Sequence, residues 1–513
     1  MCANMLARTL LSCLPVGCIV AAAFAGCSVS AGASLGVGGN DAQASDATSS
    51  GDASIGEGGV GDDGGGNDGD SGGSFTEGTH APFPRIIYQD GGIQTAPKVV
   101  TVTFAGDPMA TQLAALGATA ASSSWWDTVR QGYCEGNNGP CLGDGPTGTS
   151  VQIATAPASS YTDSAKGGAS TLQTWLQGAI ADKTLPAPDT NPITNTIYVL
   201  YFPTTTTINL DGSMSCQAFD GYHNSMTSGS QQVVYAVVPE CAPPPPPFPN
   251  IPAITTLQNT TITAAHELME AATDPSAVST GYYMSFDDPT TWGWQDVEGG
   301  GEVGDVCVDP FGMNQDETTE SGFTVQRIWS NANAAKGIDP CNPIPSSEVY
   351  FNAATQYPLY VADVGQSVTV EVDAFSTGPT SDWTLSAQDW SAYANNPYLT
   401  FSIGGATQSD AGPVIQVNNG SKVMVTVTLT QDPGSSSNGE ADGVIVSLQG
   451  DPNQPTAAHW WPFVVMSPAD AADAGLDAAV GGQARHGRWP RARPPVRRPL
   501  WPGLSVLSRR PRY

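Results

Sequence analysis

The stretch Asn195–Phe202, with the sequence NTIYVLYF, decides the fold of the first half of this chain. It is short, almost continuously apolar and rich in β-branched and aromatic side chains, which is typical of a buried strand. Similar strand-like runs lie at Lys98–Phe104, Ser150–Ala154 and Gln232–Val238, and helical spacing marks 109–133 and 165–181. Strands that alternate with helices predict an α/β layer, a mixed sheet with helices and some parallel pairing.

From about Ser346 to Ser467 the pattern changes to short alternating runs separated by turn residues. These runs are Ser367–Val372, Leu399–Ile403, Val414–Val417, Val423–Leu429, Gly443–Leu448 and Trp460–Val465. They predict an all-β, immunoglobulin-like sandwich over 346–467. No cluster of ionisable side chains stands out there, so we expect a structural or adhesive role for this domain.

The first 27 residues have the anatomy of an export signal, with Arg8 before an apolar run too short for a comfortable transmembrane helix. The run ends in Phe24-Ala25-Gly26-Cys27, which resembles the lipobox of bacterial lipoproteins and predicts lipidation of Cys27. An ordinary cleaved signal with a chance cysteine is the alternative. We expect a bacterial cell-envelope protein, either anchored to a membrane by lipid or extracellular.

Two segments are predicted to be flexible because they contain few large apolar side chains. Residues 28–82 are a Gly/Ser/Asp tether, and 468–513 are a linker followed by an Arg/Pro-rich tail. This leaves 83–345 as the α/β domain. We assign the tail no function, since disorder or an altered reading frame explains its composition. A nucleic-acid or membrane patch is the alternative.

The formal charge of −30 is unevenly distributed, because nine of the 18 basic residues lie between Arg485 and Arg512. The body of the chain is therefore strongly acidic. This composition argues against nucleic-acid binding by the body and is compatible with cation binding.

Six cysteines remain after the signal and Cys27, and an even number in an exported chain predicts disulfides. Proximity in sequence favours the pairs Cys134–Cys141, Cys216–Cys241 and Cys307–Cys341. A metal cluster is the alternative, but no pair has the tight C-x-x-C spacing.

The segment Ala265–Glu270, AHELME, is one residue away from the zinc-protease helix signature H-E-x-x-H. On a helix, His266 and Glu270 share a face, as two metal ligands must. Glu267 lies next to them, where the general base for a metal-bound water belongs. Because Glu270 replaces the second histidine, the ligand set is harder and more anionic.

A third ligand must come from elsewhere in the chain. Glu302 and Asp305 are the first candidates, since they precede Cys307 in a loop that a disulfide would hold. His223 is the other credible imidazole donor. Asp274 precedes a proline and is given an ordinary turn-forming role. His80 and His459 are interpreted as incidental.

Less specific interpretations stay open. The motif helix, expected to begin near Thr260 or Thr261 and to end before Pro275, carries H-E-x-x-E, which also arises by chance. A histidine and a glutamate at this spacing can be a hydrogen-bonded helix surface. Glu302 and Asp305 can be solvated loop acids or ligands of a structural calcium ion.

Several motifs, in order, make residues 95–345 resemble the exordium-like, phosphate-induced secreted proteins and their bacterial relatives. The matching features are Trp125–Val129 (WWDTV), NTIYVLYF, Cys216 followed by Gly221-Tyr222-His223, AVVPEC ending at Cys241, AAHELMEAATDP, GEVGDVC, and VQRIWSNA before Cys341. Plant members of the family often lack the full H-E pair. The resemblance therefore makes a metal site more plausible in this sequence and implies an exordium-like or zincin-like fold, but it does not settle activity.

We expect a lipid-tethered or secreted metal-dependent hydrolase, a zinc metallopeptidase acting on a peptide or protein. His266, Glu270 and either Glu302 or Asp305 bind the metal, and Glu267 activates water. Manganese or calcium also suits an N,O,O ligand set. The alternative is a non-enzymatic cell-surface protein that holds a structural cation and binds a partner through the sandwich.

Overall fold

A computed structural model describes residues 75–476, except 166–168, 277–278, 286, 392–396, 410–411, 435–438, 453 and 475, and the backbone of 506–508. The predicted signal, Cys27 and most of the tether and tail lie outside these residues. These described residues belong to one compact unit. Among the described residues, no helix is both long and apolar enough to cross a membrane.

The first half is built on a six-stranded mixed sheet in the order β25-β8-β9-β5-β2-β3. The neighbours β3, β2, β5 and β9 are parallel, while β8 is antiparallel to β9. The strands are β2 (Lys98–Phe104), β3 (Thr149–Ile153), β5 (Ile193–Phe202), β8 (Phe219–Ser228), β9 (Gln231–Pro239) and β25 (Val506–Ser508). The predicted α/β layer with parallel pairing is confirmed.

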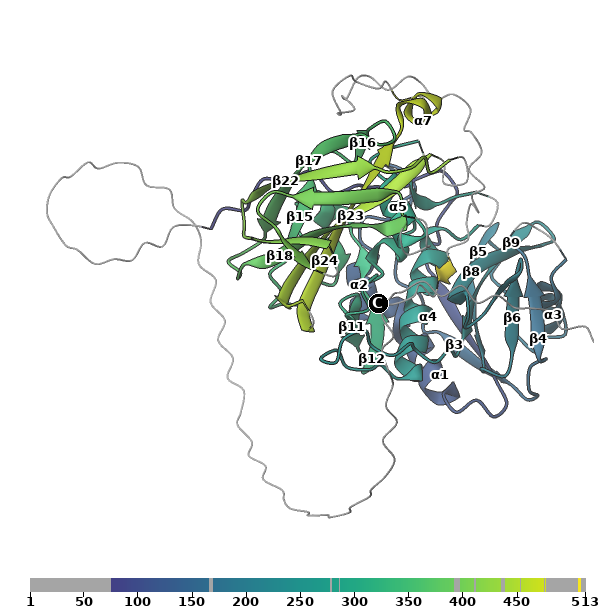
Figure 1. The fold of residues 1–513 in the computed structure, drawn as a ribbon. Helices are drawn as coiled ribbons and strands as arrows, with labels where there is room; N and C mark the ends of the chain where they lie inside the picture. Colours follow the sequence, from purple (N-terminus) through teal and green to yellow (C-terminus); the bar gives the residue numbers. More distant parts are fainter. Residues whose placement is uncertain are drawn as a thin grey trace, which may run out of the picture. The chain divides into compact units, whose positions relative to one another are not determined.

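Both faces of this sheet are covered, which explains the continuous apolar sequence of β5. On one face, Val199 packs in a core shared with α1 and α4; on the other, Leu200 packs in a core shared with α3. These helices are α1 (Ala110–Thr119), α3 (Thr171–Ala181) and α4 (Thr256–Thr273). Figure 1 shows α4 beside the sheet strands, and α3 near β4 and β6.

Two of the expected helices differ from the structure. The segment 109–133 is broken into α1, a 3-10 turn η1 (Ala120–Ser122) and α2 (Ser124–Val129), because the Ser123 side chain accepts a hydrogen bond from the Trp126 amide and starts a new helix. The segment 165–181 is helical only from Thr171, where Ser170 provides the N-cap.

Small elements complete the α/β part of the chain. They are β1 (Ile86–Tyr88), β4 (Ser160–Asp163), β6 (Thr207–Leu210), β7 (Ser213–Met214), β10 (Tyr282–Met284), α5 (Trp292–Glu298), η2 (Asp305–Cys307), β11 (Glu317–Glu320), β12 (Phe323–Gln326), β13 (Ile328–Trp329), α6 (Asn331–Ala334) and β14 (Cys341–Asn342). The apolar run Phe323–Trp329 predicts one strand, but the structure divides it into β12 and β13. β12 pairs with β11, and β13 pairs with β14.

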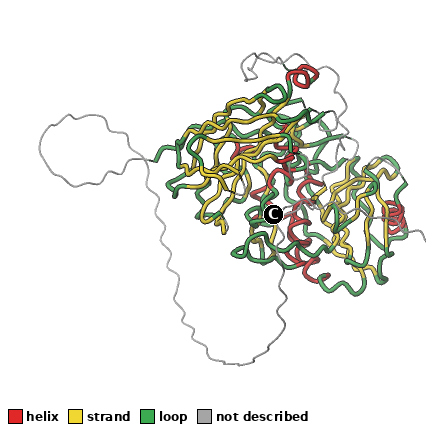
Figure 2. The backbone as a smooth tube through the Cα atoms, in the orientation of Figure 1, coloured by secondary structure: helices red, strands yellow, loops and turns green. Residues whose placement is uncertain are grey.

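The second half consists of two antiparallel-rich sheets, β15-β17-β22-β19 and β16-β24-β23-β18-β21-β20. Their strands are β15 (Phe351–Thr355), β16 (Leu359–Val361), β17 (Ser367–Ser376), β18 (Trp383–Asp389), β19 (Leu399–Ile403), β20 (Thr407–Ser409), β21 (Gly412–Val417), β22 (Lys422–Leu429), β23 (Glu440–Asp451) and β24 (Gln454–Met466), followed by α7 (Pro468–Asp473). Figure 2 shows how strands predominate here. The β-rich character is confirmed, while the exact domain boundaries and the immunoglobulin-like topology stay predictions.

Contacts between the two halves are aromatic and dense. Trp461 of β24 lies 4.9 Å from Phe83 and 5.6 Å from Trp294, measured between ring centroids. The last residues of the predicted tether also pack here, since His80 stacks on Phe375 at 3.6 Å and Gly78 donates a hydrogen bond to Asn419. The ordered chain therefore begins before residue 83, and His80 is part of the packing.

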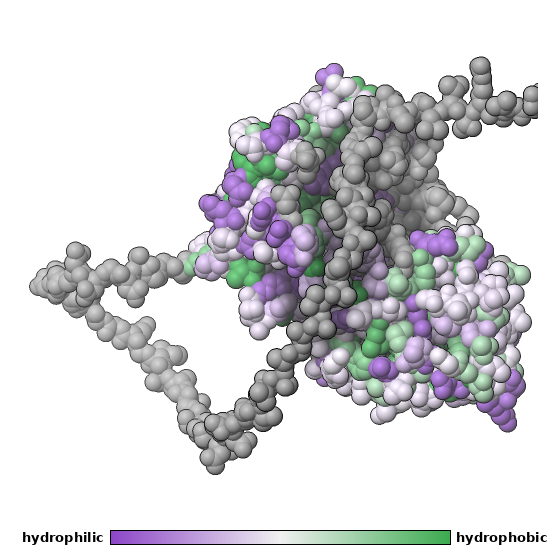
Figure 3. Space-filling model, turned by 60° about the horizontal axis from the view of Figure 1, so that its bottom comes forward, coloured by the Kyte–Doolittle hydropathy of each residue, from purple (hydrophilic) through white to green (hydrophobic). Residues whose placement is uncertain are grey.

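The face drawn in Figure 3 shows no apolar area as large as the aromatic contact between the two halves. Hydrophobic and hydrophilic residues lie there in small mixed patches. Large exposed apolar side chains in the described part are scattered: Phe75, Ile87, Val364 and Met424. Single exposed apolar residues of this kind are normal for soluble surfaces.

Buried His459 gives the sandwich a dependence on pH. Its ring lies 4.5 Å from Tyr350 and 4.8 Å from Phe351, and burial lowers its pKa to about 4. His459 binds a proton more readily in the unfolded chain than in the folded one. The contribution of the neutral, buried ring to the free energy of unfolding is therefore complete above about pH 6.5 and is lost as pH falls toward 4, by on the order of 3 kcal/mol. Urea unfolding from pH 7 to 4 should show a shallower loss for His459→Gln than for wild type. Equal slopes would contradict this role.

Candidate metal centre

Helix α4 carries the motif residues into the interior of the molecule. It begins earlier than predicted, because Thr255 and Gln258 form a capping box one turn before Thr260, and it ends at Thr273 as expected. One side of α4 packs against β8 and β9, and another side packs against β12 (Figure 1). His266, Glu267 and Glu270 are all 0% exposed, which excludes the interpretation as a solvated helix surface.

His266 and Glu270 meet across one helical turn, with Nε2 of His266 3.0 Å from Oε2 of Glu270. The other ring nitrogen, Nδ1, is 2.6 Å from Oε1 of Gln326 on β12. Because the Gln326 amide nitrogen donates to the Gly304 carbonyl, its oxygen must face the histidine, so Nδ1 carries the proton. Nε2 is thereby directed at the carboxylates, the orientation of histidines that bind metals.

The backbone of the loop before η2 fixes Glu270. Its Oε1 accepts hydrogen bonds of 3.1 Å from the amides of Gly304 and Asp305. A Cβ atom at position 304 would lie 2.7 Å from Nδ1 of His266 and 2.8 Å from Oε1 of Glu270, so only glycine permits this approach. Glu270 is thus oriented with Oε2 toward both histidines.

His223 reaches the cluster from β8. Its Nε2 lies 3.0 Å from the backbone carbonyl of Asp274, an obligate acceptor, so this nitrogen carries the proton. Its Nδ1 then faces Oε2 of Glu267 at 3.5 Å and Oε2 of Glu270 at 3.7 Å. Neither carboxylate lies at ordinary hydrogen-bond distance from this nitrogen, and these separations suit ligands of a common cation.

The structure separates the two acids that the sequence left as alternatives. Asp305 lies beside His266, with Oδ1 3.8 Å from Nε2, and its Oδ2 accepts from the Glu302 amide. Glu302 instead lies 3.6 Å from Nε2 of His223. Both are buried, at 3% and 0% exposure, so neither is a solvated loop acid.

Two ligand groups result, His223–Glu267–Glu270 and His266–Glu270–Asp305, each with its donor atoms within 4.8 Å of one another. Both oxygens of Glu267 and both of Glu302 lack a hydrogen-bond partner in the described part of the chain. A buried carboxylate without partners is costly, and a cation is the group that satisfies it. The residues therefore fit a divalent metal ion.

Burial and mutual repulsion raise the pKa values of several acids in this cluster. Burial raises the pKa of Glu267 to about 7 and that of Asp274 to about 7, and it raises the pKa of Glu302 well above its usual range. For His266, burial lowers the pKa, but the charges of Glu270, Glu267 and Asp305 outweigh it and raise the pKa to about 10. Without metal the cluster retains protons, which a bound cation would displace.

Sequence reasoning missed two contributors. Asp274 is more than a turn former, since its carbonyl accepts from His223 and its Oδ1 accepts from the Gly281 amide 2.7 Å away. Gln326 orients His266, but nothing in the pattern VQRIW indicates it. Only its position on β12, opposite α4, reveals this role.

Changing Gln326 to leucine should weaken zinc binding about 10- to 100-fold, because His266 loses the acceptor that fixes its ring. Equilibrium dialysis against buffered zinc measures this effect. Gln416→Leu, which removes a comparable side chain from the sandwich, is the matched control and should bind as wild type. An unchanged affinity for Gln326→Leu would show that the ring is held by other contacts.

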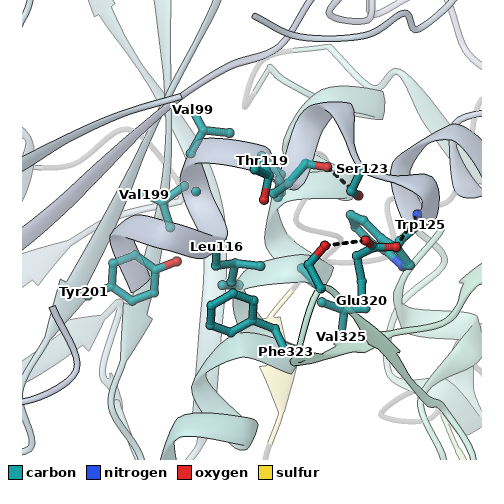
Figure 4. A pocket seen from close by; sticks show the side chains of 16 residues that line it. Val99, Leu116, Thr119, Ser123, Trp125, Val199, Tyr201, Glu320, Phe323 and Val325 are labelled. Atoms are coloured by element: carbon teal, nitrogen blue, oxygen red, sulfur yellow. Dashed lines mark hydrogen bonds between the residues drawn. The ribbon is translucent and has the colours of Figure 1, made fainter. Parts of the chain in front are cut away.

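Two hollows among the described residues do not include the cluster. One lies around Arg327, Asp339 and His459. The other is lined by the α4 residues Ala264, Ala265 and Leu268, and Figure 4 shows Leu116, Phe323 and Tyr201 at its walls. The ligand cluster itself is enclosed by protein.

All three predicted disulfides are present, and two of them hold segments that carry residues of the cluster. Cys216–Cys241 joins the segment before β8 to the end of β9, and Cys307–Cys341 ties η2 to β14. Such bonds form in oxidising compartments, so they favour a location outside the cytoplasm.

Comparison with known proteins gives little further guidance. No family model matches the chain, and no curated protein does. Among solved structures, a conjugative transposon lipoprotein from Bacteroides eggerthii is 11% identical, over 22% of this chain and 95% of that one, with a TM-score of 0.17. Domain 1 of VCBP3 from Branchiostoma floridae is 7% identical, over 24% and 99%, also with a TM-score of 0.17. At these scores neither likeness supports a conclusion.

Proposed function

We propose that this chain is an exported metal-dependent hydrolase whose substrate is a peptide or protein. The observation that carries the proposal is the state of Glu267, a fully buried carboxylate that has no hydrogen-bond partner among the described residues and lies beside His223 and His266, which each turn one ring nitrogen toward the acids of the cluster. Strongly perturbed, unsatisfied groups of this kind concentrate at functional sites.

His266, Glu270 and Asp305 would hold the cation. A divalent cation held there would lower the pKa of water and polarise a substrate carbonyl. Glu267 would take the proton of the attacking water and pass it to the leaving amine. Gln326 fixes the ring of His266 with Nε2 toward the carboxylates, and the two backbone amides keep Glu270 in place. Zinc is the preferred ion, while manganese and calcium also suit the oxygen-rich set.

We further propose that the chain belongs with the exordium-like proteins and that Cys27 carries a lipid anchor at a bacterial membrane. The order of motifs and the signal anatomy support these two proposals. The three disulfides agree with export.

A structural cation in a non-enzymatic surface protein is the second candidate. The complete enclosure of the ligands favours it, because structural metal sites are closed whereas catalytic sites retain an open position. The unsatisfied carboxylate of Glu267 favours the hydrolase when the cation occupies the group His266–Glu270–Asp305, because Glu267 is then not a ligand and can serve as a base.

The deciding experiment combines zinc content with cleavage of a peptide library by the purified chain. Wild type should retain zinc and cleave peptides. Glu267→Gln should retain zinc but lose activity by about 100-fold or more, as expected for removal of a general base, and His266→Ala should lose both. Retained zinc without cleavage by wild type would select the structural candidate. No zinc binding after reconstitution would reject both.

A further inference from the structure

We infer that the cluster has a second, weaker divalent-cation position, formed by His223, Glu267 and Glu270, and that filling it inhibits the enzyme. The inhibitory part rests on the proposed function, but the existence of the position does not. The two ligand groups share Glu270 and otherwise use different side chains.

The geometry of the second group matches a cation at least as well as the first. Donor atoms around a tetrahedral zinc lie about 3.3 Å apart, since the bonds are about 2.0–2.1 Å long. Nδ1 of His223 is 3.5 Å from Oε2 of Glu267 and 3.7 Å from Oε2 of Glu270. In the first group, the corresponding separations from His266 are 3.0 and 3.8 Å. Oε2 of Glu270 belongs to both sets and would bridge the two ions.

The charge of the cluster also accommodates two cations. Five carboxylates converge here, those of Glu267, Glu270, Asp274, Glu302 and Asp305, and none is more than 3% exposed. His223 and His266 are the basic side chains in contact with them. One divalent cation offsets two charges, whereas the five carboxylates supply up to five as cations displace their protons, so a second ion can also be neutralised.

The second position should bind more weakly because its ligands are less well held. Glu270, with its two backbone amides, is common to both groups, and each histidine has an outer partner, Gln326 for His266 and the Asp274 carbonyl for His223. The groups differ in the remaining acid, because Asp305 accepts a hydrogen bond from the Glu302 amide whereas neither oxygen of Glu267 has a hydrogen-bond partner among the described residues. Missing outer partners typically cost about 10- to 100-fold in metal affinity, and repulsion from the first ion weakens the second further.

Occupation of this position changes what Glu267 can do. A carboxylate that coordinates a cation no longer accepts the proton of the attacking water. Excess zinc should therefore inhibit hydrolysis as the second equivalent binds, and activity should pass through a maximum as zinc concentration rises.

The test is a zinc titration of the metal-free full chain, by calorimetry and by equilibrium dialysis, alongside peptide hydrolysis. Wild type should bind two equivalents, the second at least about tenfold more weakly, with activity falling as it binds. His223→Gln should bind one equivalent, and zinc inhibition, relative to its own maximum, should need at least about tenfold more zinc. Glutamine at 223 can still donate to the Asp274 carbonyl, and thermal unfolding of the metal-free variant checks its fold.

The outcomes separate the two proposals. Saturation of wild type at one equivalent, or two equivalents in His223→Gln, would overturn the second position. Two equivalents with no hydrolysis at any zinc concentration would retain the position and reject the hydrolase. If His223→Gln does not fold, Glu267→Gln replaces it in the binding experiment and should also bind a single equivalent.

Discussion

Replacing Glu270 with glutamine should weaken zinc binding by at least about 100-fold, because Glu270 is the one side chain that both ligand groups share. Outer partners alone are worth about 10- to 100-fold, so loss of a direct anionic ligand costs more. The substitution preserves shape. The amide oxygen can still accept from Gly304 and Asp305, while the NH₂ group replaces Oε2 and donates toward the histidines.

The same variant should still fold in the absence of metal. Glutamine leaves no cavity, and the repulsion that it removes among the buried acids offsets part of the loss of the ion pair between Glu270 and His266. Zinc affinity by competition with a chelator and thermal unfolding in EDTA measure the two effects. Asp382→Asn, which removes an exposed carboxylate in the sandwich, is the control and should leave both unchanged. Zinc affinity equal to wild type in Glu270→Gln would exclude Glu270 as a ligand.

Replacing Trp461 with alanine should lower the free energy of unfolding by about 3–5 kcal/mol, as for other large-to-small changes in cores. Trp461 is 3% exposed and lies among rings from both halves of the chain, Phe83 and Trp294 before residue 345 and Phe375 after it. No neighbour can fill the space without breaking another ring contact, so most of the cavity should persist.

Urea unfolding followed by fluorescence and circular dichroism measures this loss. Because Trp461 packs against both halves, the variant should also unfold less cooperatively, with the two probes no longer coincident. Met424→Ala is the control, since Met424 is 51% exposed and its truncation should cost less than about 0.5 kcal/mol. A loss below about 1 kcal/mol for Trp461→Ala would mean that the contact between the halves is not a main source of stability.

Local patterns in the sequence determined the parts of this protein that depend on near neighbours. The apolar run NTIYVLYF predicts β5, the alternating runs predict most strands of the second half, and cysteines close in sequence predict all three disulfides. The spacing of His266 and Glu270 predicts their contact across one turn of α4. Each of these depends on strand or helix periodicity or on a short loop, which a few adjacent residues encode.

The tertiary structure decided everything that joins distant segments. The antiparallel pairing of β8 with β9 brings His223 to α4, the turn of η2 places Asp305 rather than Glu302 beside His266, and β12 supplies Gln326. It also decided that the whole cluster is buried, so that carboxylates such as those of Glu267 and Glu302 lose water as a hydrogen-bond partner and find no other among the described residues. No local pattern encodes these features, because sheet order and loop packing depend on the free energy of the whole fold rather than on the residues at the site.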